Sequence, residues 1–167
     1  MKKDALKSQL HEILKQDENV LAAFEGGSAA WSRADELSDL DLVLWVKKGA
    51  TGNVAAKVQD SIEASPGINY QYEIPQPTWH GAWQAFYQLA GNNPYLLLDM
   101  VIIEEGTDWK LTEVERHGKA LILFDKGNYI QESEIDREQM AKDIQAKIER
   151  LEPIVTLFHN FVDKELE

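Results

Sequence analysis

Residues 39–46, DLDLVLWV, constrain the fold more than any other part of this chain. The segment alternates at first and then becomes wholly apolar, which is typical of a central strand that is covered on both faces. A second apolar run, YLLLDMVII at 95–103, follows the alternating segment WHGAWQAFYQLA at 79–90 and the turn residues 91–94. Two such runs joined by a turn predict a β-hairpin. The chain is therefore expected to fold around a sheet.

Helices are expected between the strands. Leucine and isoleucine recur at helical spacing in residues 3–16, which predicts an amphipathic first helix. Further helices are expected at 28–37 and 53–64, with Asn53 as the cap of the latter. Short apolar segments predict additional strands, which we place at 19–25, 68–74 and 120–124. Because strands and helices alternate, the fold class is α/β (α+β).

The chain from residue 133 onward is expected to be helical. Its apolar residues fall at alternating steps of four and three, the pattern of a helical seam: Ile144, Ile148, Leu151, Val155, Phe158 and Val162. Pro153 lies inside this pattern and predicts a kink or two abutting helices. The stripe either packs on its own domain or meets a partner helix or a second copy, which would give a homodimer. The chain stops at VDKELE without a helix-ending signal, an indication that a longer protein has been trimmed.

The net charge of the chain limits the kinds of molecule that it can bind. Seventeen basic residues against twenty-nine acidic ones give a formal charge of −12. A chain this acidic repels a phosphate backbone, so we expect no nucleic acid partner. A cationic small molecule or a basic protein surface would be attracted instead.

The sequence also lacks the residues and segments that several kinds of site and of membrane protein require. It contains no cysteine, which excludes disulfides, thiol catalysis and zinc–thiolate sites. No apolar run approaches the roughly 20 residues that span a bilayer, and the N-terminus carries no apolar signal region. We therefore expect a cytoplasmic protein without a membrane partner.

The chemistry is concentrated between residues 26 and 41. Gly26 and Gly27 lie where a strand is expected to end and a helix to begin, so the backbone could approach a phosphate closely. The Ser28 hydroxyl could donate to the same phosphate. Asp39 and Asp41 stand two residues apart on a strand, so both carboxylates project from one face. Their repulsion, a few kcal/mol at about 4 Å, would be removed by a divalent cation, and hard oxygen ligands favour magnesium.

A third carboxylate, Asp99, interrupts the apolar run at 95–103. An ionised group there needs compensation by a metal or by hydrogen bonds. A metal-site role is the favoured interpretation, and a strand-end Asp held by backbone amides is the alternative.

These residues resemble the motif of the nucleotidyltransferase superfamily of DNA polymerase β type. That motif is a hydrophobic strand, Gly-Gly or Gly-Ser, a spacer and Asp-x-Asp, with a third acidic residue on a later strand. The matching positions are Gly27, Ser28, Asp39, Asp41 and Asp99. The surrounding sequence is similar to bacterial aminoglycoside and lincosamide nucleotidyltransferase-like proteins. The resemblance implies that the three aspartates hold two magnesium ions, that Gly27 and Ser28 hold the terminal phosphates, and that ATP is the nucleoside triphosphate.

The resemblance covers residues 19–128 and implies a mixed sheet flanked by helices. It places a catalytic domain at 1–130 and a C-terminal helical extension at 131–167, the start of a truncated helical domain. The chain departs from the family pattern at Trp31 and Ser32, where many minimal members carry Arg. Arg33 is close enough to replace that arginine as a phosphate contact, and a surface charge is the alternative.

The function implied is transfer of a nucleoside monophosphate to a hydroxyl of a small molecule, such as an aminoglycoside-like cation. Two alternatives are a minimal antitoxin that modifies a protein toxin and a non-catalytic interaction module with the same fold. Two further features stay open at this point. His80 either lines an acceptor pocket or is a loop residue without a chemical role. Trp79, Trp83, Phe86 and Tyr87 either stack a base or sugar or belong to the core.

Overall fold

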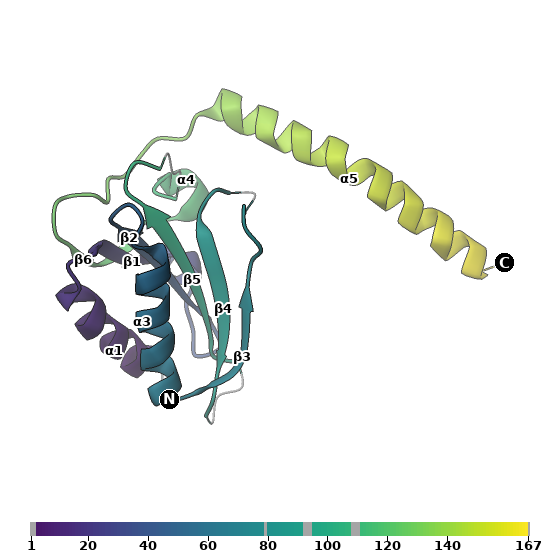
Figure 1. Ribbon diagram of the computed structural model, residues 1–167. Helices are drawn as coiled ribbons and strands as arrows, with labels where there is room; N and C mark the ends of the chain where they lie inside the picture. The colour runs from purple at the N-terminus through teal and green to yellow at the C-terminus, as the bar shows by residue number, and fades with distance from the viewer. Residues whose placement is uncertain (1–2, 79, 92–94, 108–110, 167) are drawn as a thin grey trace. The chain divides into compact units, whose positions relative to one another are not determined.

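The computed structural model describes residues 3–78, 80–91, 95–107 and 111–166. The chain divides into two compact units, residues 1–133 and 134–167. Its elements, in chain order, are α1 (Lys3–Gln16), β1 (Val20–Glu25), α2 (Gly27–Ala30), β2 (Leu40–Val46), α3 (Thr51–Ala64), β3 (Ile68–Glu73), β4 (Trp83–Leu89), β5 (Leu97–Glu104), α4 (Val114–His117), β6 (Leu121–Asp125) and α5 (Arg137–Leu166) (Figure 1).

The first unit is built on a six-stranded sheet with the order β3-β4-β5-β2-β1-β6. Strands β2 and β5 are parallel, and the other neighbouring pairs are antiparallel. Strand β2 therefore lies inside the sheet, and β4 and β5 form the expected hairpin, of whose turn residues 92–94 lie outside the described residues. The expected fold class is confirmed: a mixed sheet is flanked by helices and followed by a C-terminal helix.

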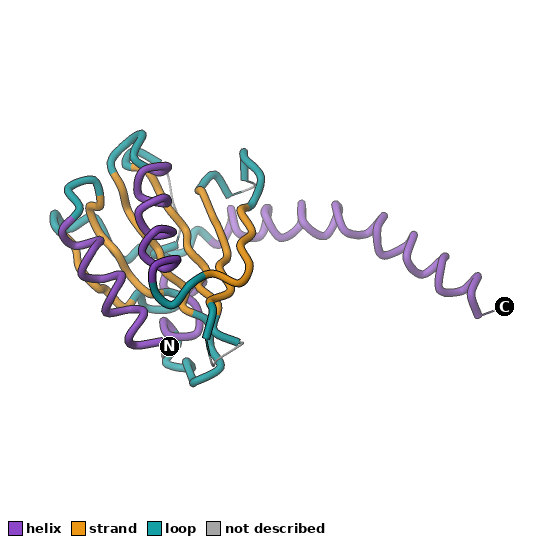
Figure 2. The backbone as a smooth tube through the Cα atoms, turned by 60° about the horizontal axis from the view of Figure 1, so that its bottom comes forward, coloured by secondary structure: helices purple, strands orange, loops and turns teal. Residues whose placement is uncertain are grey.

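Helices α1 and α3 cover one face of the sheet (Figures 1 and 2). The two helices contribute fully buried apolar side chains to the main core: Leu6, Leu10 and Leu14 from α1, with Val54, Val58 and Ile62 from α3. Strand β2 sends Leu40, Leu42, Leu44 and Val46 to this face. Because side chains alternate along a strand, Asp41, Val43 and Trp45 point to the opposite face.

The opposite face carries a second, smaller core. It joins Phe24 of β1, Val43 of β2 and Ile103 of β5 with Ala82 and Ile130. This cluster occupies one part of the face only, and the ends of β2 and β5 that carry the aspartates extend past it. The sheet therefore has one fully covered face and one face on which polar groups can stand.

Two helix predictions need correction. Helix α2 has four residues, although a helix over 28–37 was expected. Ser32 explains the early end, because its φ is +54° and its backbone N–H donates to the carbonyl oxygen of Ala29, which closes a turn in place of continuing the helix. Helix α3 begins at Thr51 with Ala50 at its N-cap, so Asn53 lies inside the helix and is not the cap.

The second unit consists of one helix of 30 residues, α5, which contains Pro153. The alternative of two abutting helices is therefore wrong. A lone helix has no interior, so its apolar stripe cannot be buried by α5 itself. The split into a catalytic domain and a helical extension, and the homodimer through this helix, stay predictions.

Candidate functional site

Asp41 and Asp99 stand side by side on the open face of the sheet. Strands β2 and β5 are parallel, and their register pairs Asp41 directly with Asp99. Paired residues of neighbouring strands point to the same face, with the strands about 4.8 Å apart. Asp39 precedes Leu40, the first residue of β2, and is the most exposed of the three aspartates. The structure thus brings together two carboxylates that lie far apart in the sequence.

Gly27 closes this pair from the side of β1. Its φ is +53°, and a Cβ placed on it would lie 1.9 Å from Oδ2 of Asp41. The neighbouring Gly26 donates its backbone N–H to the carbonyl oxygen of Asp41 at 2.9 Å. No side chain fits between the Gly27 backbone and the Asp41 carboxylate. The glycine of the sequence motif is therefore required by the aspartate that follows it.

The three carboxylates influence one another electrostatically. Burial raises the pKa of Asp99 to about 6; a hydrogen bond from Gln84 opposes this shift, and the charges of Asp41 and Asp39 add to it. Burial also raises the pKa of Asp41, and the charge of Asp39 contributes to that increase. For Asp39, burial raises the pKa while the Lys3 ammonium lowers it. The site thus concentrates negative charge that a cation would stabilise.

A chain of hydrogen bonds fixes the orientation of Asp99. The Gln84 amide Nε2 donates to Oδ1 of Asp99 at 2.7 Å, and Oε1 of Gln84 lies 3.0 Å from Nε2 of His80. Since the Gln84 oxygen needs a donor, His80 carries its proton on Nε2. Its Nδ1 then accepts from the backbone N–H of Ala82 at 3.3 Å. His80 therefore orients a candidate site residue through Gln84, which goes beyond the two roles considered from the sequence.

Glu25 connects the site to the first helix. It is the last residue of β1, only 1% exposed, and its two carboxylate oxygens lie 3.3 Å from Nζ of Lys3 and 2.9 Å from Nζ of Lys7. Lys3 also donates to the backbone carbonyl of Asp39 at 3.2 Å. Burial raises the pKa of both Asp39 and Asp41, and the Lys3 ammonium group opposes that increase. Through Lys3 and Lys7, helix α1 thus contacts the end of β1 and the backbone at Asp39.

Ser28 and Arg33 are the two residues whose side chains the sequence predicted to contact phosphate. Ser28 is partly exposed in the first turn of α2, next to Gly27. Arg33 is exposed, and its guanidinium carbon lies 5.7 Å from the ring centroid of Trp31. Its backbone N–H donates to the carbonyl of Ser28 at 2.9 Å. The segment that carries Arg33 therefore folds back onto Ser28, while the guanidinium packs against the ring of Trp31.

The donor set fits magnesium when phosphate supplies the remaining ligands. Among the residues described, no group of three or more Asp, Glu or His side chains is gathered so that it could hold a metal ion. Magnesium, however, is usually bound through one or two carboxylates together with substrate phosphates and water. Asp41, with Asp39 two residues before it and Asp99 opposite it in register, provides such carboxylates. The two-ion prediction itself is not tested by this geometry.

The raised pKa of Asp99 predicts how the metal-free protein responds to pH. An acid whose pKa is about 6 in the folded protein, against an ordinary 3.8, opposes folding when ionised. The penalty is present at pH 7 and disappears as the pH falls through 6 toward 4. We expect Asp99→Asn to raise the free energy of unfolding by about 1–3 kcal/mol at pH 7 and to have little effect near pH 4. Urea titrations at both pH values measure this difference, and an equal effect at both would contradict it.

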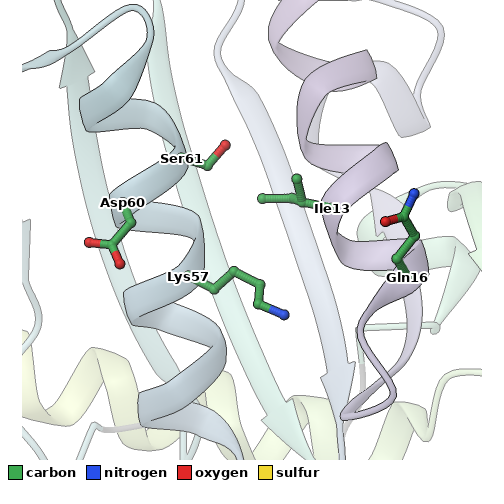
Figure 3. Close-up of a pocket in the computed structure, with 5 residues that line it drawn as sticks. All are labelled: Ile13, Gln16, Lys57, Asp60 and Ser61. Carbon is green, nitrogen blue, oxygen red and sulfur yellow. The ribbon is translucent and has the colours of Figure 1, made fainter.

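A groove between α1 and α3 lies on the other, helix-covered face. It has a volume of about 640 Å³, and Ile13 and Lys57 reach into it from opposite sides (Figure 3). Lys57 pairs with Asp17, and Gln9 of α1 donates to the Ser61 hydroxyl of α3 at 3.0 Å. These contacts link α3 to α1 and to Asp17, which follows α1. Because α1 and α3 cover the face opposite Asp41 and Asp99, the groove is separate from the carboxylate site.

Sequence reasoning missed two contributors to the site, Glu25 and Gln84. Gln84 was expected on one face of its strand, and that alternation holds, but its partner Asp99 lies on a different strand. Glu25 stands in the segment FEGG, at the end of the strand expected at 19–25, and was not singled out there. A buried position directly before the glycine pair was the signal that could have singled it out.

No protein-family model and no curated protein matches the chain. Among solved structures, it is similar to a chain of the structure of the GLD-2/RNP-8 complex, with a TM-score of 0.42 and 14% sequence identity. The match covers 60% of this chain and 34% of that one, so this chain spans about a third of its neighbour's length. Within the ranges that the structure describes, we find no helix with the length and apolarity needed to cross a membrane.

Proposed function

We propose that this protein transfers a nucleoside monophosphate from a nucleoside triphosphate, ATP, to a hydroxyl of a small molecule. The observation that carries the proposal is the contact of Gly27 with Asp41, which is paired in register with Asp99. A side-chain-free backbone beside a pair of carboxylates is suited to a phosphate chain whose charge is neutralised by magnesium. The resemblance of the sequence motif points to the same reaction.

In this proposal each residue has a limited task. Asp39 and Asp41 would hold magnesium, which when bound neutralises the phosphates and favours departure of pyrophosphate. The backbone of Gly27 and the hydroxyl of Ser28 would position the terminal phosphates. Asp99, which is paired in register with Asp41, would complete the metal site and help to remove the proton of the acceptor hydroxyl. A bond then forms between the acceptor oxygen and the α-phosphorus, and the bond to pyrophosphate breaks.

Charge supports a small acceptor in place of a polynucleotide. The formal charge of the chain is −12, and three of the aspartates that contribute to it lie at the candidate site. A polynucleotide would meet repulsion here, whereas a cation such as an amino sugar would be attracted. A protein acceptor with a basic surface is compatible with the same charge.

The test is titration of the protein with MgATP by calorimetry. We expect saturable binding that depends on magnesium, and at least about tenfold weaker binding by Asp41→Asn, because one carboxylate of the metal site is lost. Asp60→Asn, on the exposed side of α3, is the matched control and should bind as the wild type does. Equal, negligible heats for the wild type and Asp41→Asn would eliminate the enzyme proposal.

A further inference from the structure

The apolar stripe of α5 is exposed along residues 137–158, the part of the helix whose side chains the structure describes. Five side chains that carry it are between 45% and 64% exposed: Ile144, Ile148, Leu151, Val155 and Phe158. They follow one another at steps of four, three, four and three residues, which is the a and d repeat of a coiled coil. A contiguous exposed apolar surface of this kind marks a site of contact with a protein.

Pro153 identifies the side of α5 that faces away from such a contact. With Ile148 at a and Leu151 at d, Pro153 occupies position f, on the side opposite the stripe. A proline there removes the helical hydrogen bond to the carbonyl oxygen of Glu149, and water can replace that bond on a side that water reaches. Helix α5 continues through Pro153 to Leu166. The proline therefore fits a helix that exposes its outer side and covers its stripe.

The composition of α5 suits contact with a second copy of the same helix. Residues 137–158 contain four basic and four acidic side chains, whereas the whole chain has a formal charge of −12. This part of an acidic protein can therefore approach its own copy without net repulsion. Position a carries the β-branched residues Ile148 and Val155, and position d carries Leu151. In parallel coiled coils this combination favours two strands.

The charged residues beside the stripe select the direction of the two helices. Lys147 stands at g, and Glu152 stands at e of the next heptad. In a parallel pair, g of one helix lies beside that e of the other, so Lys147 meets Glu152 of the second copy. In an antiparallel pair, g faces g and e faces e. Within residues 137–158 the charged g residue is basic and the charged e residues, Glu138 and Glu152, are acidic, so the antiparallel pair joins no opposite charges.

We propose that α5 joins two copies of this protein in a parallel, two-stranded coiled coil, in which Lys147 of each copy pairs with Glu152 of the other. The apolar residues at a and d supply most of the affinity, because exposed ion pairs contribute little, and the flanking charges set the orientation. The inference goes beyond the proposed function, since it requires neither nucleotide nor metal.

Disulfide cross-linking tests the direction of the helices. The chain contains no cysteine, so a single introduced thiol reports on one position only. Ala141→Cys places a thiol at a, where parallel helices bring it next to its own copy, and we expect a disulfide-linked dimer after oxidation. Ala146→Cys is the matched control, because it makes the same change at f on the outer side, and it should stay uncrosslinked. Equal cross-linking of the two variants, or none in either, would overturn the parallel pair.

Charge reversal tests the pairing of Lys147 with Glu152. We expect sedimentation equilibrium to show a wild-type dimer, and its dissociation constant should rise about tenfold in Lys147→Glu and in Glu152→Lys, since like charges then face each other. An equimolar mixture of the two variants should associate as the wild type does, because each acidic residue then faces a basic one. A mixture no stronger than either variant alone would overturn this assignment.

The association state of the wild type decides what covers the stripe. A monomer at every protein concentration tested would overturn the proposal, and if Ile148→Asp then lowered its Tm, the stripe packs on its own chain. A trimer or tetramer would overturn the two-stranded arrangement. Because these measurements contain no ATP or magnesium, they fail or succeed independently of the MgATP titration that tests the proposed function.

Discussion

Gly27→Ala is expected to weaken nucleotide binding strongly. The substitution places a Cβ 1.9 Å from Oδ2 of Asp41, which forces the carboxylate or the glycine backbone to move. The φ of +53° adds a cost of about 1–2 kcal/mol, because L side chains clash with the backbone in this conformation. We expect the Kd for MgATP to rise more than about tenfold. Transfer activity should fall at least about 100-fold, since displacement of a reacting group by 1 Å has an effect of that size.

Gly26→Ala is the matched control for this prediction. A Cβ on Gly26 would have no atom within 4 Å, and Gly26 has a negative φ of −103°. The two variants differ by one position and add the same methyl group. Calorimetry with MgATP and thermal unfolding should show a large change for Gly27→Ala and a small one for Gly26→Ala. Similar behaviour of the two variants would mean that the contact between Gly27 and Asp41 does not organise the site.

The sequence predicted the parts of the fold that depend on local pattern. The apolar run at 39–46 identified the inner strand, and the alternation of β4 separated Gln84 from the buried Tyr87. Alternation also placed Asp39 and Asp41 on one face. The register that sets Asp99 opposite Asp41 is a property of two strands separated by more than fifty residues, and it depends on how the whole sheet packs. Local pattern alone cannot supply it.

The error at 28–37 has a local cause in the backbone. The helix ends at Ala30, because Ser32 has a φ of +54° and the backbone N–H groups of Ser32 and Arg33 donate to the carbonyl oxygens of Ala29 and Ser28. A residue in the left-handed region ends an α-helix, and the spacing of apolar residues gives no signal of it. The function of Glu25 stayed hidden for another reason. Its partners belong to a helix that is distant in the sequence, so no spacing rule connects them.

The second large effect is expected from the loss of Glu25. This carboxylate is 1% exposed and lies between the ammonium groups of Lys3 and Lys7, at 3.3 and 2.9 Å. Removing one member of a buried ion pair leaves charges without compensation and costs about 3–5 kcal/mol. We expect Glu25→Gln to lower the free energy of unfolding by about 2–4 kcal/mol, because Lys3 and Lys7 retain some access to water. Urea denaturation at neutral pH measures this loss.

A double-mutant cycle distinguishes this ion pair from a general effect of substituting a buried residue. Lys7→Met removes one ammonium group, so Glu25→Gln should cost less in that background than in the wild type. Glu12→Gln is the control for a surface charge on α1, because its side chain is 72% exposed, and it should change the stability by less than about 0.5 kcal/mol. Equal costs of Glu25→Gln in both backgrounds would contradict the pairing with Lys7. Since Lys3 also holds the Asp39 carbonyl, loosening this junction should weaken MgATP binding in parallel with the loss of stability.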